Sequence, residues 1–215
     1  MDIENKEVLR YLGFRKNAPD EATLQCIDEV EAALASVLSP KSIYGEFPLV
    51  ILTEREAQIG GKVFESEKLC RHLRSCGRVL VFAATLGTGA DGLLRRYAAT
   101  DSAKTAVAQA VLAAATESYC DEVCANIAAR EKEKGWYLRP RFSPGYGDLA
   151  LTTQKDLFSL LEITKRIGIT LTDTCLMLPT KSVTAFIGLT RQPQPCGHTD
   201  CMLCDKADCA YRKGK

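Results

Sequence analysis

An arginine, a tyrosine and an aspartate surround one Pro-Gly turn in the stretch Arg-Phe-Ser-Pro-Gly-Tyr-Gly-Asp, residues 141–148. Pro144 fixes its own φ, and Gly145 can adopt a backbone angle that other residues avoid. The Arg141 guanidinium presents a planar fork of donors that matches a carboxylate or a phosphate. The stretch therefore predicts either a site for a small zwitterionic or anionic ligand or an ordinary surface turn with a solvated arginine.

A second group of chemically active residues lies near the C-terminus, after the helix-resisting segment Arg-Gln-Pro-Gln-Pro at 191–195. Four thiolates that converge on one point suit a soft cation, and the opening of the spacing Cys-x4-Cys-x2-Cys-x4-Cys also resembles that of plant-type iron–sulfur proteins. The spacing favours zinc or an iron–sulfur cluster over free thiols or two local disulfides, and it does not decide between the two metals. The predicted ligands are Cys196, Cys201, Cys204 and Cys209, with His198 as a substitute.

The other six of the ten cysteines are scattered among apolar neighbours, where cysteine usually behaves as a small buried hydrophobe. Cys120 and Cys124 share one helix face at a spacing of i, i+4, so they form either a metal pair or part of a packed core. Packing is the interpretation that their apolar surroundings favour.

Long apolar patterns of helical period alternate with short apolar runs typical of strands. Because the strands do not alternate regularly with helices, the expected fold class is α+β with a mainly antiparallel twisted sheet. The predicted helices are 4–12, 20–38, 65–75, 90–98, 102–133 and 153–167, and the predicted strands are 43–52, 79–84, 136–138, 169–178 and 182–189.

Local signals fix several of these boundaries. Asp101 is a good N-cap for the long alanine-rich helix 102–133, whose small side chains allow close packing against a sheet. Thr153 and Asp156 resemble a capping box at the start of helix 153–167. Pro179 and Thr180 form the expected turn of a hairpin between the last two strands, which would place both in the sheet beneath the long helix.

Composition excludes several classes of protein. The 215 residues include 46% hydrophobic and 26% charged residues, an ordinary globular balance, and the net charge of +1 gives no general footprint for nucleic acid. The N-terminus lacks the pattern of a signal peptide, and no apolar run is long enough to span a bilayer. We expect a cytoplasmic protein, in which reduced thiols or metal ligands are more common than disulfides.

The order of motifs from the strand at 79–84 to the strand at 182–189 resembles the activation domain of cobalamin-dependent methionine synthase. That family has an Arg-x-x-Pro-Gly-Tyr turn, a leucine-rich helix, a Gly-x-x-Leu-Thr segment, a Met-x-Pro and a Ser-Val-Ser-Gly-like strand. The counterparts here are the 141–148 stretch, residues 156–162, Gly168 to Thr172, Met177 to Pro179, and Ser182 to Phe186.

The resemblance implies a domain that binds S-adenosylmethionine and helps to remethylate an inactivated cobalamin that a partner presents. By matching position, Arg141 is the ligand-binding arginine, and Gly145 and Tyr146 form the turn beside it. Glu117 is the implied acidic contact, with Asp121 as the alternative position. The implied partners are a corrinoid-binding methyltransferase such as methionine synthase and an electron-donating flavodoxin or ferredoxin.

Two parts of the family pattern have no counterpart: an acidic position near the start of the domain and a pair of tyrosines on a late strand. Three hypotheses therefore remain open from the sequence. The chain is a stand-alone reactivation subunit, a non-catalytic docking module for a corrinoid protein with a structural zinc tail, or an unrelated metal or redox protein. The expected organisation is an activation-like domain at 1–190 and a cysteine-rich, metal-binding tail at 191–215.

Overall fold

The computed structural model describes residues 3–14 and 18–193 of the chain. Its centre is a six-stranded sheet of order β3-β2-β1-β4-β8-β5, in which every neighbouring pair is antiparallel. Within the described residues, a second, two-stranded sheet is formed by β6 and β7. The expected fold class, α+β with a mainly antiparallel sheet, is confirmed.

The strands of the main sheet come from distant parts of the sequence. Central β4 is almost completely buried and pairs with β1 on one side and β8 on the other. Apolar side chains on both faces explain its continuous run of valine, leucine, phenylalanine and alanine. The strands are β1 (Lys41–Ile51), β2 (Glu56–Ile59), β3 (Lys62–Glu65), β4 (Arg78–Thr85), β5 (Tyr137–Phe142) and β8 (Ser182–Thr190).

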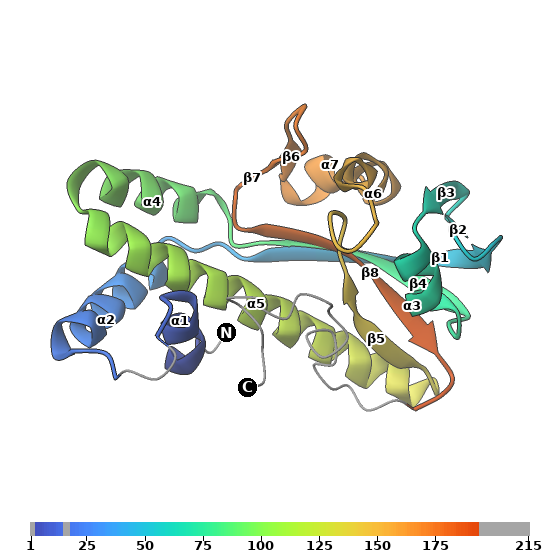
Figure 1. Cartoon of the computed structure of the whole chain (residues 1–215), viewed down its shortest axis with the longest axis horizontal. Helices are drawn as coiled ribbons and strands as arrows, with labels where there is room; N and C mark the ends of the chain where they lie inside the picture. Colours follow the sequence, from blue (N-terminus) through green and yellow to red (C-terminus); the bar gives the residue numbers. More distant parts are fainter. Residues whose placement is uncertain (1–2, 15–17, 194–215) are drawn as a thin grey trace.

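One face of the sheet is covered by the long helix α5 (Ser102–Glu133), which crosses it diagonally (Figure 1). Asp101 caps this helix as predicted, because its carboxylate accepts a hydrogen bond from the Lys104 amide at 2.9 Å. Gly135, with φ of 74°, follows the helix end in the left-handed conformation and turns the chain into β5. The core between α5 and the sheet includes Phe82 and Ile187.

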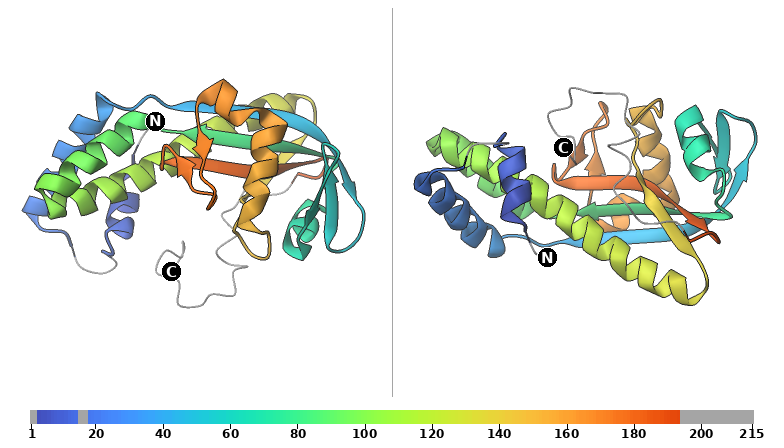
Figure 2. Two further views of the ribbon diagram at one scale, coloured as in Figure 1. Left: turned by 90° about the horizontal axis from the view of Figure 1, so that it is seen from above. Right: turned by 60° about the horizontal axis from the view of Figure 1, so that its bottom comes forward.

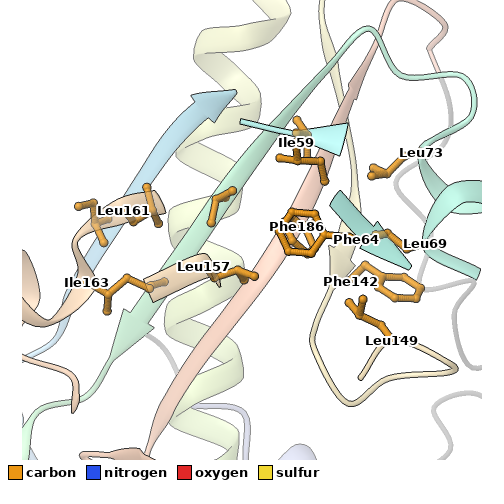
Figure 3. Close-up of a cluster of buried hydrophobic side chains, with 14 of the residues drawn as sticks. Ile59, Phe64, Leu69, Leu73, Phe142, Leu149, Leu157, Leu161, Ile163 and Phe186 are labelled. Carbon is orange, nitrogen blue, oxygen red and sulfur yellow. The ribbon is translucent and has the colours of Figure 1, made fainter. Parts of the chain in front are cut away.

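The opposite face is covered by α3 (Glu67–Leu73), α6 (Gln154–Leu161) and α7 (Ile163–Ile167). Its core is built around Phe64 and Phe186, whose ring centroids lie 5.0 Å apart in an edge-to-face arrangement. Figure 3 shows both rings among side chains from α3, α6, α7 and the segment that follows β5. Successive residues of β5 and β8 thus point to two different cores.

A third core lies beyond the sheet, around the N-terminal half of α5. Helices α1 (Asn5–Tyr11), α2 (Glu21–Ala35) and α4 (Thr88–Thr100) surround that half of α5 in Figures 1 and 2. The predicted helices at 4–12, 20–38, 90–98 and 102–133 are therefore confirmed. None of the helices in the described ranges is long and apolar enough to cross a membrane.

The prediction that 169–178 is a strand of the main sheet is wrong. Residues 170–171 and 177–178 pair with each other as β6 (Thr170–Leu171) and β7 (Met177–Leu178). The chain already turns between them: the Thr172 amide donates to the Leu176 carbonyl at 2.9 Å, and Cys175 adopts a positive φ of 62°. The expected turn at Pro179–Thr180 joins no hairpin, because β8 pairs with β4 and β5 instead.

The predicted single helix 153–167 is broken at Glu162, which has a φ of 51°. Residues two apart on one helix do not share a face, but Leu161 and Ile163 are both buried in the same core. The break lets both side chains point inward. The predicted capping box is also wrong, since Thr153 makes no side-chain cap and its hydroxyl donates to the Ala150 carbonyl at 2.7 Å.

Candidate functional site

Arg141 forms the centre of a charged cluster between β5 and α5. Its two terminal nitrogens donate to Glu117 Oε2 and to Asp121 Oδ1, each at 2.7 Å. The nitrogen that binds Asp121 also lies 3.7 Å from Cys124 Sγ. The arginine side chain is only 18% exposed, whereas the two carboxylates are 41% and 51% exposed. A largely buried cation is thus held by two acids that remain open to solvent.

The periods of the two elements bring these residues together. Arg141 pairs with Ile187 and Phe142 with Phe186, so alternation along β5 directs Arg141 to the α5 face and Phe142 to the opposite core. On α5, Glu117, Asp121 and Cys124 follow one another at intervals of four and three residues and share one side of the helix. The sequence predicted Glu117 with Asp121 as an alternative; the structure places both carboxylates on the arginine.

The protonation states in this cluster are well separated. Burial opposes the charge of Arg141, but the Glu117 carboxylate and the hydrogen bonds to Asp121 and Cys124 favour it, so its pKa is raised and the guanidinium stays charged. Burial also raises the pKa of Cys120 to about 12, although Arg141 partly offsets the effect. Cys120 is therefore a fully buried, protonated thiol at neutral pH, which agrees with the packing interpretation of this cysteine.

Helix α1 also approaches the cluster, which the sequence alone did not indicate. Burial raises the pKa of Tyr11, and the Glu117 carboxylate raises it further against the opposing effect of Arg10. The Arg10 guanidinium lies 4.3 Å from the centre of the Tyr11 ring and binds Glu7 at 2.7 Å. The only sequence signal was the apolar pattern of a short helix, which gave no information about where that helix packs.

The Pro-Gly turn after β5 does not direct its side chains toward Arg141. Gly145 and Gly147 adopt φ values of 84° and 62°, and the Gly145 amide donates to the Leu149 carbonyl at 2.9 Å. The Tyr146 ring is 46% exposed and packs edge-to-face on Phe142, with centroids 5.6 Å apart. Tyr146 therefore contacts the side chain that serves the opposite core, and the structure does not bring its ring onto the ion pair.

The carboxylate of the turn has a structural task. Asp148 accepts hydrogen bonds from Ser66 Oγ at 2.5 Å, from the Glu67 amide at 2.8 Å and from the Lys68 amide at 3.2 Å. Ser66 in turn accepts from the Leu69 amide at 2.9 Å. The two side chains together cap α3 and tie it to the turn 82 residues away. Asp148 is thereby removed from the set of ligand-binding candidates.

We expect Asp148→Ala to lower the free energy of unfolding by about 1 kcal/mol at neutral pH, the usual value of a lost cap. Burial raises the pKa of Asp148, but the hydrogen bonds from Ser66, Glu67 and Lys68 outweigh it and lower the pKa below its ordinary value. The contribution is therefore complete above the unfolded pKa of about 4 and is lost as pH falls through the folded pKa.

Urea unfolding of wild type and variant at several pH values between about 2 and 7 measures this difference. The matched control is Asp28→Ala, which removes an exposed aspartate from α2. A wild-type advantage over Asp148→Ala that does not shrink in acid would contradict the capping role.

The predicted metal ligands Cys196, Cys201, Cys204 and Cys209 lie outside the described residues. Within residues 3–14 and 18–193, no group of three or more histidine, cysteine or acidic side chains is placed to hold a metal ion. The metal site thus stays a prediction from the spacing of the cysteines.

The fold is similar to that of a known structure, the MetH reactivation domain bound to AdoHcy. The two chains superpose with a TM-score of 0.64 at 17% sequence identity, and the match covers 86% of this chain and 73% of the other. At that identity the likeness establishes the fold. A search of curated proteins found no significant match.

Residues 75–199 match the sequence profile of the family described as "Vitamin B12 dependent methionine synthase, activation domain". The matched region contains β4, the long helix α5, the Arg141 cluster and the Pro-Gly turn, and it amounts to more than half of the chain. The helices α1, α2 and α3 and the strands β1, β2 and β3 precede it. The chain belongs to the activation-domain family of vitamin B12-dependent methionine synthase.

Proposed function

We propose that this protein reactivates a corrinoid-dependent methyltransferase, most specifically methionine synthase, by binding S-adenosylmethionine at Arg141. The observation that carries the proposal is the largely buried guanidinium held between Glu117 and Asp121 inside the family's matched region. An arginine that is kept charged and fixed in place suits a ligand carboxylate. Gly145 and Tyr146 would shape the turn next to the bound ligand.

The charges of the cluster fit the chemistry of this ligand. One arginine and two acids leave one net negative charge, with the acids more exposed than the arginine. S-adenosylmethionine carries a carboxylate, an ammonium and a sulfonium, so its net charge is positive. The carboxylate would exchange with an acid on Arg141, and the released acid would face the ligand's cationic groups. S-adenosylhomocysteine lacks the sulfonium charge and would bind more weakly.

The reaction itself takes place on the substrate that the partner presents. One electron from a flavodoxin or ferredoxin reduces cobalt(II) to cobalt(I). The cobalt electron pair then forms the bond to the methyl carbon while the carbon–sulfur bond breaks and its electrons stay on sulfur. The products are methylcobalamin and S-adenosylhomocysteine, without a proton transfer. This protein would bind and orient the methyl donor, as cofactor chemistry generally requires of its protein.

A direct test uses cob(II)alamin bound to a methionine synthase that has been deprived of its own activation domain. Methyl-labelled S-adenosylmethionine and reduced flavodoxin are added with and without this protein, and labelled methylcobalamin is counted. We expect label in the corrinoid only when the protein is present. Equal labelling in its absence would contradict the proposed reactivation.

One observation favours a second function, a docking module that does not bind S-adenosylmethionine. Both terminal nitrogens of Arg141 already have carboxylate partners within the chain, which is the arrangement expected of a structural ion pair. In that case the fold would recognise a corrinoid-binding domain without supplying a methyl donor. The protein would then associate with the corrinoid protein in the labelling experiment without transferring label.

We propose further that the chain comprises an activation-like domain at 1–190 and a tail at 191–215 in which Cys196, Cys201, Cys204 and Cys209 bind one metal centre. Four cysteines so close in sequence need only short loops to converge. An iron–sulfur cluster would offer a route for the electron, whereas zinc would only order the tail.

For this tail we expect about four thiols of anaerobically purified protein to resist alkylation until a chelator or oxygen is added. Metal analysis of the same sample identifies zinc or iron, and a visible charge-transfer band accompanies a cluster. Rapid alkylation of all four thiols in fresh protein without bound metal would contradict the site. The control is Cys26→Ser, which changes a cysteine in the helical part of the chain and should leave the number of protected thiols and the bound metal unchanged.

A further inference from the structure

A second cation contacts the same helix as Arg141. Lys181, directly before β8, donates from Nζ to Gln109 Oε1 at 2.8 Å. Gln109 precedes Glu117 on α5 by eight residues, so the two contacts are separated by about 12 Å along the helix axis. Ala113, midway between them on the same row, is small and half-buried. Lys181 and Arg141 therefore mark the two ends of one strip of α5.

The ammonium of Lys181 forms no direct ion pair with any of the described acids, although Asp91 lies nearby. Among the described residues no carboxylate lies within 4.0 Å of its ammonium, and its observed partner is the neutral amide of Gln109. The nearby Asp91 is engaged by Thr180, whose amide and hydroxyl donate to it at 3.0 Å and 2.5 Å. Burial lowers the pKa of Lys181, and Asp91 offsets this only in part. The contact of Lys181 with Gln109 is itself exposed, so the ammonium is partly desolvated by the fold and still open to a ligand.

An ammonium has three donors, and Gln109 takes one of them. The others suit neutral oxygen and nitrogen acceptors of a ligand that lies along the strip. S-adenosylmethionine has that form: the amino-acid end carries the carboxylate for Arg141, and the adenosine end carries ribose oxygens and purine nitrogens. We propose that Lys181 is a second binding residue for S-adenosylmethionine, donating to an acceptor of its adenosine group. This inference rests on the proposed function.

Two ligands and three variants test it. 5′-Methylthioadenosine has the adenosine group but lacks the amino-acid end. We expect Lys181→Ala to weaken binding of both S-adenosylmethionine and 5′-methylthioadenosine by about tenfold or more. Arg141→Ala should weaken only S-adenosylmethionine. Lys165→Ala, which removes an exposed lysine of α7, is the control and should change neither affinity.

Gln109→Glu separates a ligand contact from a merely structural role. The new carboxylate would form an ion pair with Lys181, so the fold should be as stable as the wild type or more stable. Binding of 5′-methylthioadenosine should nevertheless fall by about fivefold or more, because the ammonium is engaged and the acid repels the purine acceptors. A structural lysine would leave this affinity unchanged.

One outcome is that the wild-type protein binds S-adenosylmethionine while Lys181→Ala and Gln109→Glu each change its affinity by less than twofold. That result would overturn the assignment of Lys181 and leave the proposed function intact. A wild-type protein that binds neither ligand would instead contradict the proposed function and this inference with it. Thermal unfolding of each variant shows whether a loss of affinity reflects a loss of folded protein.

Discussion

Arg141→Ala is expected to weaken the binding of S-adenosylmethionine by about 2–5 kcal/mol, a loss of at least about thirtyfold in affinity. The substitution removes the cation that faces the ligand carboxylate. It also leaves Glu117 and Asp121, one helical turn apart, as adjacent negative charges that repel each other. Titration calorimetry of the wild type and the variant measures the difference.

A double variant, Glu117→Gln with Asp121→Asn, is the matched control for this experiment. It keeps Arg141 and removes the acids that occupy the guanidinium, so the carboxylate end of the ligand meets less competition while its cationic groups lose their partners. We expect its affinity to be closer to the wild type than to that of Arg141→Ala. If Arg141→Ala binds as tightly as the wild type, the ion pair is structural and the site lies elsewhere.

Gly89→Ala is expected to lower the free energy of unfolding by an amount near the upper end of the about 1–3 kcal/mol typical of overpacking. Gly89 lies in the first turn of α4, where a Cβ atom would approach the carbonyl oxygen of Val37 to within van der Waals overlap and meet Val37 Cβ at 3.1 Å. The obstacle is backbone, so no side-chain rotation relieves it. Helix α4 would have to move away from the segment after α2.

Gly92→Ala, one helical turn further along α4, is the control, because a Cβ atom there meets nothing within 4 Å. It should stabilise the helix by about 0.5–1 kcal/mol through propensity. Urea unfolding of both variants measures the two effects. Equal stability of the Gly89 and Gly92 variants would show that the close contact between α4 and Val37 does not exist in solution.

The sequence predicted the elements whose signals are local. The helix from Asp101 to Gly135 has a cap, a long apolar pattern and a terminal glycine, and the structure confirms each. Buried β4 and β8 were predicted from short apolar runs. The hairpin of β2 and β3 was missed because it comprises two four-residue strands with few apolar residues. Such strands are too short for the two-residue alternation of a strand to be recognised in the sequence.

The errors share a physical cause, which is that tertiary partners decide between locally equivalent choices. Residues 170–178 alternate like a strand, yet β8 finds its partners in β4 and β5, which are distant in sequence. The helix break at Glu162 follows from the burial of two flanking side chains. Asp148 looked like a ligand group, and only the fold reveals that it caps α3.

The candidate site was predicted in part. Arg141 and Glu117 were identified by position in the family pattern, and the helical spacing of Glu117 and Asp121 explains why both reach the arginine. The pattern also grouped Tyr146 with Arg141, but strand alternation separates Arg141 from Phe142, on which the Tyr146 ring packs. Tyr11 comes from a segment without a functional motif, and Lys181 lies between two motifs of the family pattern without belonging to either, so only tertiary packing brings them to α5.

Equilibrium dialysis of the 215-residue chain against labelled S-adenosylmethionine tests the central claim most directly, because it detects binding without a partner, an electron donor or a heat signal. The proposal predicts saturable binding of one molecule per chain, with labelled S-adenosylhomocysteine bound more weakly. If the wild-type protein retains no more label than Arg141→Ala does, the proposed binding of S-adenosylmethionine at Arg141 is contradicted.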